Sequence, residues 1–370
     1  MKIKTIGVKY PQVRLVMNKV PNVEYTWVQN YINPFLKKAK LYEVYKPLGD
    51  FGVDGYHTVN TIMLTEKPWC CSFEDYVPRG MIKEFWDLAY WGVDIGRNKR
   101  IDRLMKILAK DNCKRLIALS EHNLHMQQLF YDRYGHAEIT DIIRKKTIML
   151  KVPQSCMVDA PQNEVSEDTP VKFVFVGNDF SRKGGVELIM ALKEIRKVRK
   201  DFELYLITII NNKQWDEAIY YDNLSLLEYV KSQDWIHYYS KLKNSEVMDI
   251  IKQCHVGLLP TWFDTYGYSV LEMQACGVPV ISTNVRAMSE INKYGWIIEM
   301  PINFNKEIKP VEYKYRELLI GELYNIFMSI LSNKKVIQEK SISCLNYIRC
   351  HHSPEEYSKQ LKQIYSEFSK

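Results

Sequence analysis

Residues 257–290 constrain the fold of this chain more tightly than any other stretch. Gly257 to Pro260 is a short apolar run typical of a buried strand, and a polar loop follows it. Ser269 to Ala275 has the composition of a helix that a glycine and a proline end, and Val278 to Ser282 is apolar again. A strand, a loop, a helix and a strand in this order predict one unit of a parallel sheet. We therefore expect an α/β fold.

Two carboxylates stand where this loop meets the helix. Asp264 lies in the loop, and Glu272 lies one to two turns into the helix. The helix N-terminus between them offers backbone N–H groups and the positive end of the helix dipole to an anion. Carboxylates suit sugar hydroxyls and a helix start suits a phosphate, so the two together predict a site for a sugar nucleotide.

The stretch resembles the donor-site signature of family 4 glycosyltransferases (glycosyl transferases group 1), which are retaining enzymes of the GT-B fold. Their pattern is an acidic residue, seven residues and a Glu, continuing into a small-residue-Gly-x-Pro-Val run. The matching positions are Asp264, Gly267, Glu272, Ala275, Gly277, Pro279 and Val280, with Glu290 further on. The first acid is Asp where the family usually has Glu, which shortens its reach by one methylene. The alternative is an ordinary αβ unit with Glu272 on a solvated helix face.

A second loop fits the same interpretation. The apolar run Phe173 to Val176 leads into a helix that begins near Gly184, a glycine that lets backbone approach a ligand. Arg182 and Lys183 at the helix start can neutralise a diphosphate without a metal. Lys183 matches the lysine that the family supplies here. Asn178 stands where the family usually has Arg, and Arg182 is the candidate replacement.

The resemblance implies further donor contacts. The nucleotide base is expected beside the loop after a strand at 235–239, mostly through backbone contacts, and the donor is expected at the start of the acidic-motif helix. The residues at these places are Tyr239, Ser240, Tyr266, Gly267, Tyr268 and Ser269.

The first half of the chain supplies a further candidate, Glu74. Trp69 to Phe73 is a compact apolar strand, and the resembled family often ends a strand here in Phe-His, with the His directed at the transferred sugar. Glu74 takes that position and can accept hydrogen bonds from hydroxyls. The candidates on the acceptor side are His57, Ser120 and Arg79. A lone His near a strand also fits a purely structural role.

The chain organisation follows from these elements. We predict two Rossmann-like domains facing across a cleft. Residues 1–152 form the acceptor-binding domain, 153–170 a linker, 171–352 the nucleotide-sugar domain and 353–370 a helix that returns to the first domain. Residues 10–35 are expected as a loop with a short helix, and helices are expected at 81–91 and 97–109.

Composition limits the class of protein. The chain has 370 residues, 46% hydrophobic and 26% charged, with eight cysteines that have no metal-binding spacing. No run is long and apolar enough for a membrane span and no signal peptide is evident, so a cytoplasmic protein is expected. Net charge is +7, with the excess in residues 1–160. The basic face of the 97–109 helix fits either a solvated surface or peripheral contact with an anionic membrane at its inner face.

The expected activity is glycosyl transfer with retention, from a nucleotide diphosphate sugar (UDP-sugar favoured) to a saccharide, lipid-linked or protein-linked acceptor in glycan biosynthesis. No metal, cofactor or nucleic acid is expected. By resemblance, Arg182 and Lys183 stabilise the departing diphosphate, Glu272 holds the ribose, and Asp264 and Glu74 orient the sugar. The alternatives are an inactive sugar-nucleotide- or glycan-binding relative that serves as a partner subunit, and a GT-B-fold nucleotide-sugar epimerase.

Overall fold

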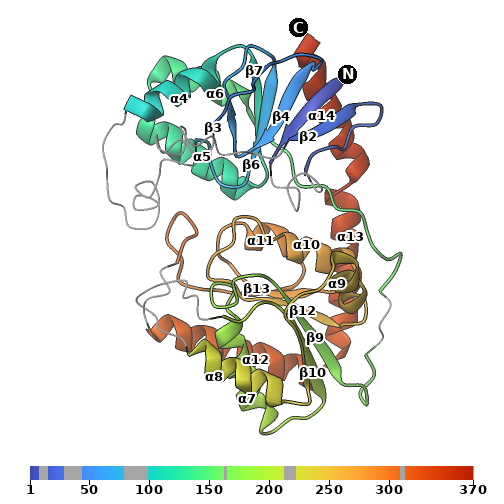
Figure 1. Ribbon diagram of the computed structural model, residues 1–370. Helices are drawn as coiled ribbons and strands as arrows, with labels where there is room; N and C mark the ends of the chain where they lie inside the picture. The colour runs from blue at the N-terminus through green and yellow to red at the C-terminus, as the bar shows by residue number, and fades with distance from the viewer. Residues whose placement is uncertain are drawn as a thin grey trace. The chain divides into compact units, whose positions relative to one another are not determined.

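The computed structural model describes residues 1–7, 16–28, 44–78, 99–161, 165–211, 222–308 and 313–369. The chain forms two compact units, shown in Figure 1. The first comprises Met1–Pro153 and His352–Lys370, and the second comprises Gln154–His351. The chain therefore enters the second unit at the start of the proline-rich segment 153–170 and leaves it just before the last helix.

The first unit is built on a parallel sheet with the strand order β2-β1-β4-β6-β7-β8. Its strands are β1 (Lys2–Ile6), β2 (Glu24–Val28), β4 (Gly55–Val59), β6 (Trp69–Phe73), β7 (Cys113–Ala118) and β8 (Thr147–Met149). A separate pair is formed by β3 (Val44–Tyr45) and β5 (Ile62–Met63). Every residue of β4 and β6 is buried, as expected for central strands of a parallel sheet covered on both faces.

In the part of this unit that the structure describes, the helices are α4 (Lys99–Ala109), α5 (Glu121–Tyr134), α6 (Ala137–Lys146) and α14 (Pro354–Ser366). The predicted apolar face of α4 is buried. Ser353 caps α14 by accepting the N–H of Glu356 at 3.3 Å. The hydroxyl of Tyr357 in α14 donates to the carbonyl of Val16 at 2.8 Å, which ties this helix to the first unit (Figure 1).

Two predictions for the first unit were incomplete or wrong. Residues 24–28 form the strand β2, where a loop with a short helix was expected. This strand lies at the sheet edge and is largely exposed, so it has no buried face to produce an alternating apolar pattern. Helices α5 and α6 were not predicted, and α5 buries the polar side chains of His122, Asn123 and Gln127, which breaks its apolar periodicity. The helix expected at 81–91 lies outside the described residues.

The second unit has its own parallel sheet, with the strand order β11-β10-β9-β12-β13-β14. Its strands are β9 (Val171–Val176), β10 (Phe202–Ile207), β11 (Ile236–Tyr239), β12 (Val256–Leu259), β13 (Val280–Thr283) and β14 (Trp296–Ile298). Together with the parallel sheet of the first unit, it confirms the predicted fold class of two Rossmann-like units.

Helices lie on both faces of this second sheet (Figure 1). They are α7 (Gly185–Arg196), α8 (Asn223–Ser232), α9 (Asn244–Ile251), α10 (Tyr268–Ala275), α11 (Met288–Ile291), α12 (Tyr313–Ser332) and α13 (Lys335–His351). On one face α7 and α12 pack together over the strands, where the rings of Phe173 and Phe327 lie 4.8 Å apart. On the other face α10 packs against α13.

The segment expected to be a linker is packed on the second unit where the structure describes it. The N–H of Met157 donates to the carbonyl of Ala275 at 2.7 Å, and Pro161 lies beside Gly277. The chain therefore covers the end of α10 before it enters β9.

All eight cysteines are free thiols. Among the helices that the structure describes, none has the length and apolar character needed to cross a bilayer.

Candidate functional site

The strand order of the second sheet reverses between β9 and β12. From β9 the chain adds β10 and β11 on one side, and it then returns to add β12, β13 and β14 on the other. Ligands of open α/β sheets bind outside the carboxyl ends of the strands at such a switch point. Residues 177–184 follow β9 and residues 260–267 follow β12. The topology thus brings together the two loops that the sequence singled out.

A buried ion pair joins these loops. The Nζ of Lys183 contacts Oδ2 of Asp264, and their side chains are only 10% and 13% exposed. Burial lowers the pKa of Lys183, and Asp264 opposes that shift. Burial alone would raise the pKa of Asp264, but Lys183, Arg182 and the N–H of Tyr266 outweigh it and hold that pKa below its ordinary value. Asp264 therefore stays ionised at neutral pH and provides the counter-charge that Lys183 needs to keep its proton.

The second carboxylate oxygen of Asp264 shapes its own loop. Oδ1 accepts the N–H of Tyr266 at 3.2 Å and of Gly267 at 3.1 Å, an Asx turn that places the carboxylate next to the start of α10. Gly267 has a φ of +90°, and a Cβ there would overlap the side chain of Met288. This turn needs the short aspartate side chain, which gives a physical reason for Asp at a position where the resembled family usually has Glu.

Gly184 lies where the two loops make backbone contact. Its φ is +75°, and a Cβ there would overlap the carbonyl oxygen of Pro260. Beside it, the N–H of Trp262 donates to the carbonyl of Arg182 at 3.0 Å. Gly184 and Gly267 are the N-cap residues of α7 and α10, and neither has a side chain that could cap its helix. An anion can take that place at both helix starts.

The guanidinium of Arg182 is engaged in holding the two loops together. Its Nε donates to Oδ2 of Asp179 and its Nη1 donates to the carbonyl of Phe263, each at 2.8 Å. The Arg182 side chain is 23% exposed. Because two of its donors already have partners, Arg182 does not stand free to replace the arginine that the family has at the position of Asn178. Asn178 itself is exposed.

The remaining donor-side candidates occupy two places. Glu272 is 5% exposed in the second turn of α10. Tyr268 and Ser269 open that helix half-buried, and the Tyr268 ring lies 5.0 Å from the buried ring of Tyr266. All of these side chains lie within nine residues of Asp264 along the chain.

The expected base-binding residues lie further along the same sheet edge. Tyr239 ends β11, which is two strands from β9, and its carbonyl accepts the N–H of Thr208 at 3.1 Å. The Tyr239 side chain is half-buried, and Ser240 is exposed. Both follow the carboxyl end of a strand, which is the side of the sheet where the switch point binds ligands.

A second buried ion pair lies behind the acidic loop, and the sequence did not reveal it. Arg286 and Glu307 have side chains that are 0% and 1% exposed, with Nη2 and Oε1 2.6 Å apart. The guanidinium of Arg286 lies 3.8 Å from the ring centroid of Phe263, the residue before Asp264. The N–H of Arg286 also donates to the carbonyl of Lys306 at 2.9 Å. No spacing rule connects residues 286 and 307, so only the fold brings them together.

In the first unit, Glu74 follows β6 and is held by its neighbours. The side chain of Asn60, which follows β4, accepts the N–H of Glu74 at 3.0 Å and donates to its Oε2 at 3.2 Å. Asn123 donates to the Glu74 carbonyl. Ser120 caps α5 by accepting the N–H of Asn123 at 3.0 Å. Glu74 and Ser120 thus share the carboxyl edge of this sheet. The contact between Asn60 and Glu74 was not predicted from the sequence.

His57 lies away from that edge. It is in the middle of β4 and fully buried, and its ring nitrogens contact the hydroxyls of Tyr365 at 2.8 Å and of Ser72 at 2.9 Å. Burial lowers the pKa of His57 to about 3. The acceptor-side hypothesis for His57 is therefore corrected, because one ring nitrogen attaches α14 to the sheet through Tyr365 and the other contacts Ser72 in β6. Arg79 lies outside the described residues.

Within the described ranges, no three His, Cys, Asp or Glu side chains are grouped so that they could hold a metal ion. The expectation of a metal-independent reaction stays a prediction.

Comparison with known proteins gives this site a context. Residues 159–303 match the family described as glycosyl transferases group 1. An uncharacterized 41.2 kDa protein in the cps region of Klebsiella pneumoniae is 26% identical over 41% of this chain and 37% of its own length. D-inositol 3-phosphate glycosyltransferase from Arthrobacter sp. (strain FB24) is 28% identical over 31% of this chain and 27% of its own length. The chain thus spans about a third of the length of these relatives.

The solved structures extend the likeness to the whole chain. Sucrose-phosphate synthase from Thermosynechococcus elongatus aligns over 99% of this chain and 98% of its own, with a TM-score of 0.62 at 14% identity. At this identity the likeness shows the fold alone. Residues 159–303 are thus similar to the glycosyl transferases group 1 family, and the two Rossmann-like units have the GT-B fold.

Proposed function

We propose that this chain is a retaining glycosyltransferase. It moves a sugar from a nucleotide diphosphate sugar, with UDP-sugars favoured, to a saccharide, lipid-linked or protein-linked acceptor, and it needs no metal ion. One observation carries the proposal: the buried Lys183–Asp264 pair at the switch point between β9 and β12, inside the residues that match the family. A cation for a diphosphate and a carboxylate for sugar hydroxyls lie side by side there.

The diphosphate would lie against the starts of α7 and α10. The Lys183 ammonium has three N–H donors, so it can donate to a phosphate oxygen while it still contacts Asp264. The uncapped N-termini of both helices add backbone N–H groups and the positive ends of two dipoles. These groups are in place before the reaction begins, which is the arrangement that stabilises charge on a departing group.

The proposed reaction breaks the bond between the anomeric carbon and the diphosphate oxygen, and both electrons of that bond leave with the diphosphate. The acceptor hydroxyl then attacks from the same face, and its proton passes to the oxygen of the leaving diphosphate. Asp264 would hold a sugar hydroxyl near the anomeric carbon, Glu272 would hold the ribose hydroxyls, and Glu74 would provide a further contact to the sugar.

A second candidate is a relative that binds a sugar nucleotide without transferring the sugar. The engagement of Arg182 by Asp179 and Phe263 favours it, because the second cation expected for the diphosphate is already in use. Release of free sugar from the nucleotide sugar, in the absence of acceptor, would exclude this candidate.

Thermal unfolding with UDP, GDP, ADP and their common sugar conjugates, without metal, tests the donor site. We expect one nucleotide family to raise the melting temperature of the wild type and to leave the melting temperature of Glu272→Ala unchanged. Glu228→Ala, an exposed position in α8, is the matched control and should respond like the wild type. No shift with any nucleotide at millimolar concentration would refute the assignment of the donor to the second unit.

A further inference from the structure

The exposed side of α4 carries a stripe of cations. Lys99, Arg103, Lys106 and Lys110 are all exposed, and their spacing of four, three and four residues puts them on one side of the helix. The opposite side is buried in the first unit through Ile101, Leu104, Met105 and Leu108. The exposed cations therefore run from the start of α4 to Lys110, the residue that follows its last turn.

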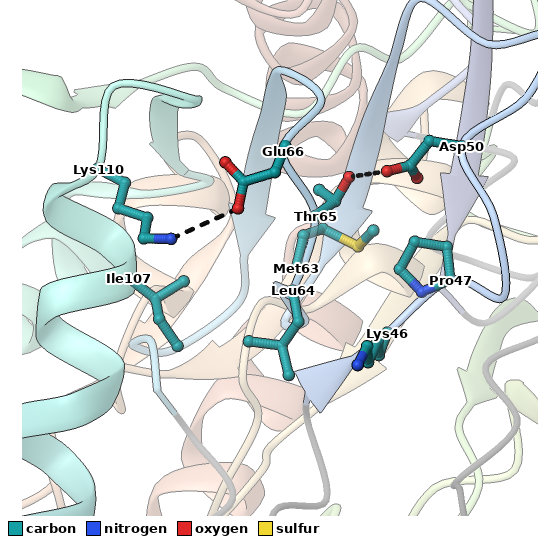
Figure 2. A pocket seen from close by; sticks show the side chains of 9 residues that line it. All are labelled: Lys46, Pro47, Asp50, Met63, Leu64, Thr65, Glu66, Ile107 and Lys110. Carbon is teal, nitrogen blue, oxygen red and sulfur yellow. Dashed lines mark hydrogen bonds and ion pairs between the residues drawn. The ribbon is translucent and has the colours of Figure 1, made fainter.

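The stripe ends at a pocket of about 370 Å³, which is shown in Figure 2. Lys110 and Lys46 lie on opposite sides of this pocket, and Lys46 belongs to the loop that follows β3. The two acidic residues that line this pocket, Glu66 and Asp50, already have polar partners. Oε1 of Glu66 lies 3.7 Å from the Nζ of Lys110, and Asp50 accepts the Thr65 hydroxyl at 2.7 Å and a tyrosine hydroxyl from β4 at 2.6 Å.

The loop that begins at Lys46 projects two large apolar side chains. Leu48 is 110% exposed and Phe51 is 94% exposed, more than any other large apolar side chain in the described ranges. Gly52, with a φ of +68°, follows them. Leu48 and Phe51 contribute nothing to the core, so they leave apolar area in water in the same loop as Lys46, which lines the pocket together with Lys110.

We propose that this surface, consisting of Leu48, Phe51, Lys46 and the α4 stripe, docks on an anionic lipid bilayer. Protruding apolar side chains enter the boundary of the acyl chains while neighbouring lysines and arginines lie at the anionic headgroups. A protein partner fits less well, because a stable interface buries roughly 800 Å² on each side around an apolar centre depleted of charge. Here Leu48 and Phe51 are two isolated apolar side chains in a loop that begins at Lys46. The docking needs neither donor nor acceptor, so it goes beyond the proposed function.

Co-sedimentation of the full chain with vesicles tests the surface. We expect binding to vesicles that contain phosphatidylglycerol, little binding to phosphatidylcholine alone, and loss of binding at high salt. Leu48→Ser with Phe51→Ser should lower the partition coefficient by at least about tenfold. Arg103→Gln with Lys106→Gln should lower it about 25-fold, about fivefold for each charge.

The matched control is Val198→Ser with Lys231→Gln, which makes the same two kinds of change at exposed positions of the second unit and should bind like the wild type. All changed side chains are exposed, so the melting temperatures should agree with the wild type. Equal partition of the surface variants and the control would overturn the proposal. So would binding to heparin, an anionic polysaccharide, without binding to vesicles. The nucleotide-induced thermal shift is measured separately, so failure of docking and failure of the donor site are distinguishable.

Discussion

Removing both members of the Lys183–Asp264 pair should destabilise the second unit by less than the sum of the two single removals. Asp264→Asn leaves the Lys183 ammonium buried and without its hydrogen-bond partner. The cost has a ceiling of about 5 kcal/mol, because a lysine of ordinary pKa 10.5 can lose its proton at pH 7 at that cost. We expect about 3 kcal/mol, the lower end of the range for breaking a buried pair.

Lys183→Met should cost less, about 2 kcal/mol. The Asp264 carboxylate keeps the backbone N–H groups of Tyr266 and Gly267, so part of its charge remains compensated. The cost of Lys183→Met cannot exceed about 4 kcal/mol, because a carboxyl of ordinary pKa 3.8 can be protonated at pH 7 at that cost. The double variant leaves no isolated charge and should cost about 3 kcal/mol, so the two changes are coupled by about 2 kcal/mol.

Urea unfolding followed by circular dichroism measures all three variants. The matched control is the exposed pair Lys197–Glu194 in α7, whose Nζ and Oε2 atoms lie 2.6 Å apart. Lys197→Met and Glu194→Gln should each cost less than about 0.5 kcal/mol, because exposed pairs contribute little. Additive costs at 183 and 264, or costs no larger than those of the control pair, would refute the inference that the pair is a buried, mutually dependent unit.

Three further predictions rest on single positions. Burial lowers the pKa of His57 to about 3 in the folded protein, from 6.5 in the unfolded chain. The neutral ring therefore contributes its full share of folding stability above pH 6.5, and that stability is lost as the pH falls towards 3. When the pH is lowered from 7 to about 4.5, the free energy of unfolding measured in urea should fall by about 3 kcal/mol more for the wild type than for His57→Gln. Asn60→Gly removes the amide that contacts Glu74 but tolerates the left-handed backbone (φ 54°), so it should lower the rate of donor hydrolysis about tenfold. Asn60→Ala should have the same effect on the rate and should also lower the free energy of unfolding by about 1 kcal/mol, because alanine is strained in that backbone conformation. Gly184→Ala should lower the melting temperature more than Gly267→Ala, because its Cβ meets the backbone of Pro260 and the other meets the flexible side chain of Met288.

The sequence was most informative where local pattern and fold agree. The strand at 69–73 has the predicted bounds, since it has a strong apolar pattern. The strand at 24–28 was missed because an exposed edge strand is stabilised by backbone pairing with β1 and has little side-chain pattern. Propensity and periodicity describe what side chains bury, so an element that buries little is poorly predicted by them.

The site shows the same limit more sharply. The spacing between Asp264 and Glu272 located the acidic motif, and the resemblance located Lys183. The direct contact between Asp264 and Lys183 joins residues 81 positions apart and depends on the order of the strands. His57 was a reasonable candidate from its residue type alone, and only its buried contacts with Tyr365 and Ser72 reveal its structural role.

The charges around the acidic loop bear on how the proposed diphosphate would be bound. Arg182 is paired with Asp179, Arg286 with Glu307, and Lys183 with Asp264, so three cations meet three anions. Both arginines also lie near the ring of Phe263, and they brace the loop from two sides. Because each of these three cations already has a partner, the negative charge of the proposed diphosphate would be met by the remaining N–H donors of Lys183 and by the starts of α7 and α10. The two glycines that begin those helices therefore matter as much as the lysine, since any side chain at either position would move a helix start away from the anion.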